Sequence, residues 1–168
     1  PQHAHLIRPT DQGGYGLDAL WNDDFHHSAV VRLTGHNEAY YTDYLGGADE
    51  LLSAVKWGFL YQGQRYKWQA KPRGTPAFGL PGASFVTFLE NHDQVANSLH
   101  GQRISQMTSP GRYRALTALL LLGPGTPLID RAVEGPARLS PFFRSLVAGF
   151  FVLFLASGWA YGAAAGAV

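Results

Sequence analysis

A short apolar run that ends abruptly in a polar cluster most constrains how this chain can fold. Residues 85–89, Phe-Val-Thr-Phe-Leu, have the β-branched and aromatic composition of a buried strand. Polar side chains follow at once, in the order Glu90, Asn91, His92, Asp93 and Gln94. In α/β barrels and open α/β sheets, ligand sites are built at the carboxyl ends of the strands. The placement of this cluster therefore favours a functional site over a polar turn that only caps the next helix.

Two members of this cluster, His92 and Asp93, offer chemistry. A carboxylate beside an imidazole at the end of a buried strand suits the stabilisation of developing positive charge. If Asp93 is catalytic, it needs a partner carboxylate elsewhere. Alternation along the strand turns Glu90 to the opposite side from Asn91, so we expect Glu90 to be structural and paired with a cation.

Strands are expected to alternate with helices along the chain, with the strands at residues 17–21, 85–89 and 126–129. The spacing of apolar residues and the N-cap signals predict helices at residues 24–34, 50–60 and 112–122. Asp49 is expected to cap the second helix, whose apolar face would consist of Leu51, Leu52, Val55, Phe59 and Leu60. Residues 1–16, 36–48 and 61–82 are expected to be loops. This order predicts an α/β fold with a parallel sheet, either open or part of a barrel.

Composition excludes several classes of function. The net charge is +1 with no run of Lys or Arg, so nucleic acid is not expected as a partner. The chain has no cysteine, which excludes a disulfide scaffold and a thiolate site and fits a reducing compartment. A cytoplasmic location is therefore expected. The motifs of serine hydrolases, P-loop proteins, dinucleotide-binding proteins and zinc sites are absent from the sequence.

Another polar cluster, the first along the chain, occupies residues 21–27, Trp-Asn-Asp-Asp-Phe-His-His, at a predicted strand-to-helix junction. Its Asp and His side chains can make directional hydrogen bonds to sugar hydroxyls, so it is a candidate polyol-binding rim. Alternatively, Asp23 or Asp24 simply caps the helix and interacts with its positive end. A metal site is not expected, because His26 and His27 are adjacent and point about 100° apart on a helix.

The last segment differs in composition from the rest of the chain. Residues 145–168 contain no charged residue and are long enough for a transmembrane helix, with Arg138 and Arg144 just before them. The second half of this segment is rich in Gly and Ala and is only mildly apolar. We expect residues 130–168 to be a divergent tail of the kind that a shifted reading frame gives, with a membrane anchor as the alternative.

The two polar clusters together carry a family resemblance. Residues 13–27 and 88–97, with Leu-Leu-Leu-Leu-Gly-Pro-Gly-Thr-Pro-Leu at 119–128, resemble the maltooligosyltrehalose trehalohydrolases of the α-amylase superfamily of glycoside hydrolases. The resemblance covers about residues 1–129. It implies an incomplete (β/α)₈ barrel that contains about strands six to eight, and an α-1,4-glucan substrate that carries trehalose at its end. It implies no cofactor and no metal ion, because retaining hydrolysis needs carboxylates and water.

The resemblance also implies roles for individual residues. Asp93 would stabilise the oxocarbenium-like transition state, and His92 would bind a sugar hydroxyl. The substrate subsites would be lined on one side by Asp23, Asp24, Phe25, His26 and His27. The other wall would consist of Gln94, Val95, Ala96 and Asn97.

The sequence departs from the family in two places. The segments that carry the family's nucleophile and acid/base carboxylates are not found, so we expect the chain alone to be catalytically inactive. The similarity ends after Ile129, where Asp130-Arg-Ala-Val-Glu-Gly replaces the family's strand-end loop. The alternatives are another α-glucan enzyme of the superfamily, such as a branching or debranching enzyme, or a non-catalytic, membrane-tethered glucan-binding module.

Overall fold

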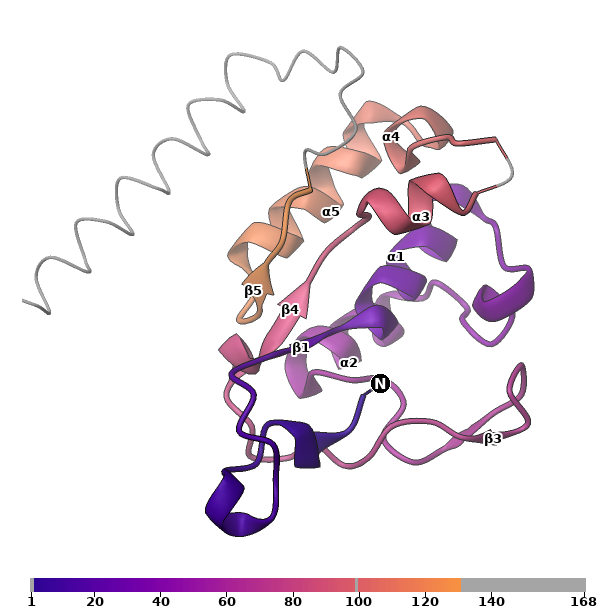
Figure 1. Cartoon of the computed structure of the whole chain (residues 1–168). Coiled ribbons are helices and arrows are strands. Elements are labelled where there is room, and N and C mark those ends of the chain that lie inside the picture. Colours follow the sequence, from indigo (N-terminus) through magenta and orange to yellow (C-terminus); the bar gives the residue numbers. More distant parts are fainter. Residues whose placement is uncertain (1, 99, 131–168) are drawn as a thin grey trace, which may run out of the picture. The chain divides into compact units, whose positions relative to one another are not determined.

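Three short parallel strands form the central sheet of the computed structural model, which describes residues 2–98 and 100–130 (Figure 1). The strands are β1 (Leu20–Trp21), β4 (Phe85–Thr87) and β5 (Thr126–Pro127), in the order β1-β4-β5. Leu20 lies opposite Phe85, and Val86 lies opposite Thr126. The predicted strands are confirmed in place, and each is shorter than predicted. Their parallel pairing confirms the predicted α/β class.

Besides the central sheet, the described residues form helices and a small hairpin (Figure 1). The α-helices are α1 (Asp23–Thr34), α2 (Ala48–Trp57), α3 (His92–Ala96), α4 (Ile104–Met107) and α5 (Pro110–Leu122). Single 3₁₀ turns are η1 (Ala4–Leu6), η2 (Thr10–Gln12), η3 (Ala39–Tyr41) and η4 (Gly82–Ser84). The predicted long loop at 61–82 contains a short antiparallel pair, β2 (Arg65–Tyr66) and β3 (Lys71–Pro72).

Local capping explains where the two long helices begin and end. The Asn22 side chain caps α1, and Gly35 ends it in the left-handed conformation at φ 77°. Ser109 caps α5, and Pro110 occupies its first turn, where the missing N–H costs nothing. Both helices therefore lie where the sequence predicts them.

The second helix differs from its prediction. Gly47, and not Asp49, is the N-cap residue of α2, and the helix ends at Trp57. The assignment of Leu52 to the buried face was wrong, because its side chain is 62% exposed while Leu51 is buried. The predicted window ran past Gly58, whose φ of 84° ends the helix and brings its backbone against the Phe85 ring.

The helices pack their apolar sides into one core beside the sheet. Its buried members come from α1, α2, α5 and the segment after β4, and they are Phe25, Ala29, Leu51, Ala54, Leu89 and Leu120. A second cluster joins β1 and β4 to the segment between α2 and β4, and it consists of Leu20, Phe59, Ala77 and Phe85. These clusters anchor the strands whose carboxyl ends carry the two polar clusters.

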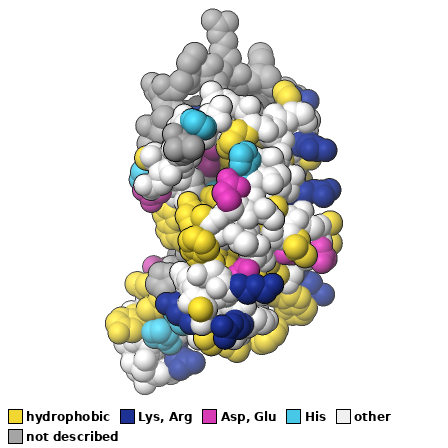
Figure 2. Space-filling view, turned by 90° about the vertical axis from the view of Figure 1, so that its right-hand side faces the viewer, with side chains coloured by type: hydrophobic (Ala, Val, Ile, Leu, Met, Phe, Trp, Pro, Cys, Tyr) yellow, Lys and Arg dark blue, Asp and Glu magenta, His cyan; other side chains and the backbone are white. Residues whose placement is uncertain are grey.

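Charged and hydrophobic side chains share one face of the molecule. Figure 2 shows Lys and Arg side chains over the lower part of one face and along its right-hand edge, beside hydrophobic side chains. Among the described residues, no helix has both the length and the apolar character needed to cross a membrane. The predicted tail at 130–168, apart from Asp130, lies outside the described residues.

Candidate active site

The first polar cluster begins where β1 ends and α1 starts. The Asn22 Oδ1 accepts the Phe25 N–H at 3.1 Å, and its Nδ2 donates to the Gly58 carbonyl at 2.5 Å. The Asn22 N–H donates to the Val86 carbonyl of β4 at 2.8 Å. One residue thus joins three segments, and these bonds fix the direction in which α1 leaves the sheet.

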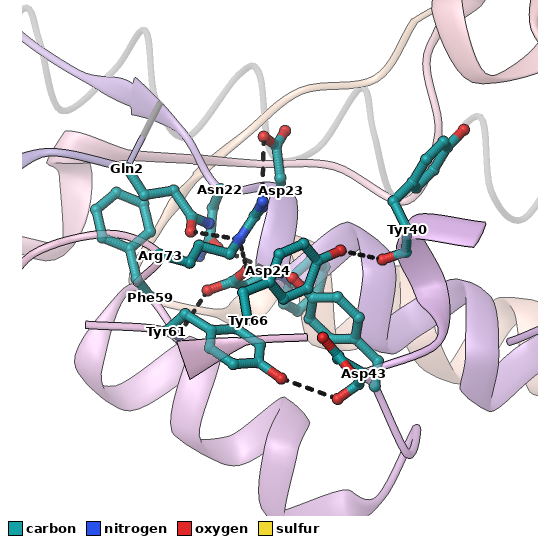
Figure 3. Close-up of polar contacts among 12 residues, drawn as sticks. Gln2, Asn22, Asp23, Asp24, Tyr40, Asp43, Phe59, Tyr61, Tyr66 and Arg73 are labelled. Atoms are coloured by element: carbon teal, nitrogen blue, oxygen red, sulfur yellow. Dashed lines mark hydrogen bonds and ion pairs between the residues drawn. The ribbon is translucent and has the colours of Figure 1, made fainter. Parts of the chain in front are cut away.

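Asp24, the second residue of α1, is fully buried and accepts hydrogen bonds from three segments (Figure 3). Its carboxylate accepts from the Tyr44 hydroxyl at 2.5 Å and from the Tyr61 N–H at 2.8 Å. The Arg73 Nε donates to it at 3.2 Å. Burial and the neighbouring carboxylate of Asp24 raise the pKa of Tyr44, so its hydroxyl remains a donor. Asp24 therefore ties the start of α1 to the loops that cover it.

Arg73 connects Asp24 to the more exposed Asp23 (Figure 3). Its Nε also donates to the Gln2 Oε1 at 3.1 Å, and its Nη2 lies 3.9 Å from the Asp23 Oδ2. The guanidinium lies 4.8 Å from the centre of the Tyr66 ring. Burial raises the pKa of Asp23, and the charge of Arg73 opposes that rise. Asp23 keeps 38% of its side-chain surface exposed, so it is the carboxylate of this cluster that a ligand can reach.

The two histidines of α1 are buried in their neutral form. His26 Nδ1 lies 2.5 Å from the Leu89 carbonyl, which only accepts, so Nδ1 carries the proton. His26 Nε2 then accepts from the Tyr41 hydroxyl at 3.3 Å. Burial lowers the pKa of His26 to about 4. Burial also lowers the pKa of His27 to about 2, helped by repulsion from the neighbouring His26 ring when both are protonated and by the charge of Arg73.

The predicted sugar-binding rim at residues 23–27 is therefore mostly interior in the described part of the chain. Phe25 is 1% exposed and belongs to the main core, and Asp24 and His26 are equally buried. His27 is 8% exposed and lies among the rings of Tyr40, Tyr41 and Tyr44. The contact of this cluster with sugar stays a prediction, and Asp23 is its most accessible member.

The second polar cluster forms the start of α3, directly after β4. The Asn91 Oδ1 accepts the Asp93 N–H at 2.8 Å, and the Gln94 Oε1 accepts the Asn91 N–H at 2.9 Å. This capping box uses the side chains of Asn91 and Gln94 for structure. The two residues between them, His92 and Asp93, begin α3, and their side chains take no part in the box.

His92 and Asp93 are open to solvent. Their side chains are 56% and 65% exposed, and His92 Nε2 lies 3.4 Å from the Asp93 Oδ1. The other ring nitrogen, Nδ1, lies 2.7 Å from the Oδ2 of Asp130, whose side chain is 16% exposed. The hydrogen bond to Asp130 and the charge of Asp93 raise the pKa of His92. The structure thus gathers an imidazole and two carboxylates at the ends of β4 and β5.

The remaining predicted wall residues lie along α3. Gln94 is half-buried, Val95 is buried, and Ala96 and Asn97 are exposed. The Asn97 Nδ2 donates back to the Asp93 carbonyl at 2.8 Å. The structure therefore brings the exposed members of this wall next to Asp93, while Val95 faces the interior.

Glu90 has the structural role that alternation along the strand predicts. Its Oε2 accepts the Ile104 N–H at 2.7 Å, and its Oε1 lies 3.8 Å from the Arg103 Nη1. Burial raises the pKa of Glu90, and the bond from Ile104 and the charge of Arg103 oppose the rise. The prediction that Glu90 pairs with a cation is confirmed.

Two important residues were missed from the sequence. Arg73 lies in a stretch without local signals, 49 residues after Asp24, so no sequence pattern pointed to it. Asp130 lies beyond the predicted end of the family resemblance. It directly follows the predicted strand at 126–129, and polar residues at the carboxyl ends of parallel strands are site candidates, so this signal could have identified it. Among the described residues, no group of three or more His, Cys, Asp or Glu side chains could hold a metal ion.

No protein-family model matches the chain, but individual proteins do. The malto-oligosyltrehalose trehalohydrolase of Deinococcus radiodurans is 41% identical over 130 residues, which are 75% of this chain and 21% of that protein. That of Saccharolobus solfataricus is 35% identical over 129 residues, 77% of this chain and 23% of that protein. That of Mycobacterium tuberculosis is 30% identical over 168 residues, 92% of this chain and 29% of that protein.

The fold agrees with these sequence matches. A crystal structure of a Salmonella typhimurium protein, provisionally assigned as an alpha amylase, superposes with a TM-score of 0.64 at 35% identity. The match covers 83% of this chain and 26% of that protein. The chain thus spans about a quarter of the length of the curated relatives that it matches. By sequence and fold, the chain belongs to the malto-oligosyltrehalose trehalohydrolases of the α-amylase superfamily, and it corresponds to one segment of those proteins.

Proposed function

We propose that this chain forms the part of a (β/α)₈ barrel that contains strands six to eight, in a retaining glycoside hydrolase. The substrate would be maltooligosyltrehalose, and the enzyme would cleave the α-1,4 bond next to the trehalose unit. The similarity to named trehalohydrolases over three quarters of the chain or more supports this assignment. The parallel order β1-β4-β5, in which helices separate successive strands, supports the barrel segment.

The observation that carries the proposal is the exposed pair His92 and Asp93 at the carboxyl end of β4. An exposed carboxylate at this position can lie against a sugar ring and stabilise the positive charge of an oxocarbenium-like transition state. Asp23, at the end of the neighbouring strand β1, is the second accessible carboxylate and is proposed to bind sugar hydroxyls. The nucleophile and the acid would come from the three quarters of the family's length that the chain does not match.

The chemistry assigns different tasks to the proposed residues. Asp93 and His92 bind the glucose ring at the cleaved bond, Asp93 through charge and His92 as a hydrogen-bond donor. Asn91 and Gln94 hold the two residues at the start of α3. No cofactor is proposed, because carboxylates and water suffice for retaining hydrolysis. The cytoplasmic location stays a prediction, since it rests on the absence of cysteine.

A chimeric enzyme tests the proposal. The matching segment of the Deinococcus radiodurans relative is replaced by residues 1–130 of this chain, and release of trehalose from maltooligosyltrehalose is measured. We expect hydrolysis, and we expect Asp93→Asn to lower kcat by about a thousandfold, roughly 4 kcal/mol in the barrier. The matched control is Asp49→Asn, because Asp49 is an exposed carboxylate in the first turn of α2.

Three outcomes would count against the proposal. A folded chimera that releases no trehalose would contradict the assigned activity. Full activity in the Asp93→Asn variant would remove Asp93 from the site. Action on glycogen branch points in place of maltooligosyltrehalose would assign the segment to a branching or debranching enzyme of the same superfamily.

A further inference from the structure

Asp130 holds His92 by two separate hydrogen bonds. Its Oδ2 accepts the backbone N–H of His92 at 3.0 Å and lies 2.7 Å from the ring Nδ1 of the same residue. One carboxylate oxygen therefore fixes both the main chain and the ring at the first residue of α3. The backbone bond holds the carboxylate beside the His92 main chain, and the bond to Nδ1 ties the ring to the same oxygen, so the two bonds together restrict rotation of the ring about its Cα–Cβ bond.

Strand pairing brings Asp130 to this position. The Leu128 N–H donates to the Thr87 carbonyl at 2.7 Å, which continues the β4–β5 pairing by one residue. Asp130 follows two residues later, and His92 lies five residues beyond Thr87, at the start of α3 after the neighbouring strand β4. The carboxyl ends of two adjacent parallel strands thus place these side chains together.

The two sides of the His92 ring have different surroundings. The Nδ1 edge lies 2.7 Å from the Asp130 Oδ2, which belongs to a side chain that is 16% exposed. The Nε2 edge, 3.4 Å from the Asp93 Oδ1, lies beside a side chain that is 65% exposed. A carboxylate accepts and does not donate, so Nδ1 must carry a proton, and Nε2 is presented next to Asp93.

We propose that Asp130 is a positioning residue that presets the His92–Asp93 pair for a sugar ring. It keeps the ring in one orientation and the Nδ1 proton in place, so that a ligand meets an ordered pair of polar groups. Less rotational freedom is then lost on binding. The relevance of this pair to a sugar rests on the proposed function, whereas the hold of Asp130 on His92 is a property of the chain itself.

Electrostatics agree with this geometry. The pKa of His92 is raised, first by the hydrogen bond to Asp130 and then by the charge of Asp93. A raised pKa means that the imidazolium persists to higher pH, because each carboxylate favours the charged ring. Within residues 2–98 and 100–130, the carboxylates of Asp130 and Asp93 are the charged groups that raise the pKa of His92.

The exchange of the histidine C2 hydrogen for deuterium, followed by mass spectrometry, measures the His92 pKa in the 168-residue chain. Asp130→Asn should move the midpoint of His92 downward, and by more than Asp93→Asn moves it. The matched control is Glu38→Gln, which removes the acidic partner of another exposed histidine, His36. It should leave the His92 midpoint unchanged.

The wild-type chain gives a second readout that needs no variant to fold. Nitrogen-15 correlation spectra above the His92 midpoint should show the neutral ring with its proton on Nδ1. A proton on Nε2 would overturn the proposal, and so would an Asp130→Asn midpoint equal to that of the wild type. Neither measurement uses a glucan or an activity, so failure here is distinct from failure of the proposed hydrolase function.

Discussion

The two polar clusters follow neighbouring strands and contain the same residue types, yet they have opposite surroundings. After β1, Asp24 is fully buried and accepts from Tyr44, Tyr61 and Arg73. After β4, Asp93 is 65% exposed. Position at the end of a parallel strand therefore brings polar groups together, but it does not decide whether they bind a ligand or hold the fold. What covers them decides that.

The cover over the first cluster comes from the segment between α1 and β3. Tyr44 and Tyr66 are fully buried, and both lie against the network around Asp24 and Arg73. Within residues 2–98 and 100–130, His92 and Asp93 have no comparable cover, as their exposures of 56% and 65% show. The first cluster should thus control stability and the second should control binding, and this contrast can be tested.

The largest effect on stability is expected for Asp24→Asn. Removing this charge leaves the mostly buried guanidinium of Arg73 without its shortest carboxylate contact. Breaking such a pair from one side costs about 3 to 5 kcal/mol. Urea unfolding followed by tryptophan fluorescence measures the change in the free energy of unfolding.

The adjacent residue provides the control. Asp23 is 38% exposed and lies 3.9 Å from the same guanidinium, so Asp23→Asn should cost about 1 kcal/mol or less. Equal losses for the two variants would show that burial does not separate these neighbours. The contrast between the clusters would then fail within the first of them.

Acid should weaken the first cluster before the second. The pKa of His26 is lowered to about 4 and that of His27 to about 2, so the unfolded chain takes up protons below pH 6.5 while the folded chain does not. Stability is complete above pH 6.5 and falls below it, by about 1.4 kcal/mol per pH unit for each histidine. At pH 5 we expect a loss of about 2 kcal/mol from each. Urea unfolding at pH 7.5, 6 and 5 measures it.

The exposed histidine should not share this behaviour. The pKa of His92 is raised and not lowered, so the variant His92→Gln should retain the acid-dependent loss of stability. A free energy of unfolding that stays constant between pH 7.5 and 5 would mean that His26 and His27 are not held neutral in the folded chain.

Local signals in the sequence were sufficient to predict the elements that carry the clusters. The cap residue Asn22 and the terminating Gly35 define α1, and the apolar run at 85–89 marks β4. These signals act within a few residues, where capping and side-chain alternation dominate. The predicted buried face of α2 was wrong at Leu52, because the predicted helix has more apolar residues than one helix face can hold.

Long-range pairing was not predictable in the same way. Alternation showed that Glu90 needed a cation, but it could not identify Arg103 as that cation. The partners of Asp24 lie 20, 37 and 49 residues away, and nothing near Tyr44, Tyr61 or Arg73 marks them. The exposure of Asp23 against the burial of Asp24 depends on those partners, so the sequence could not distinguish the two.

A smaller effect is expected at Asn91, the buried residue of the second cluster. Its side chain is 2% exposed and caps α3 by accepting the Asp93 N–H. Asn91→Ala removes this cap and should cost about 1 kcal/mol of unfolding free energy. Asp93→Asn keeps the cap and changes an exposed side chain, so it should stay within about 0.5 kcal/mol of the wild type. If Asp93→Asn cost as much as Asn91→Ala, Asp93 would be part of the structural framework, and the division between a closed first cluster and an open second cluster would have to be abandoned.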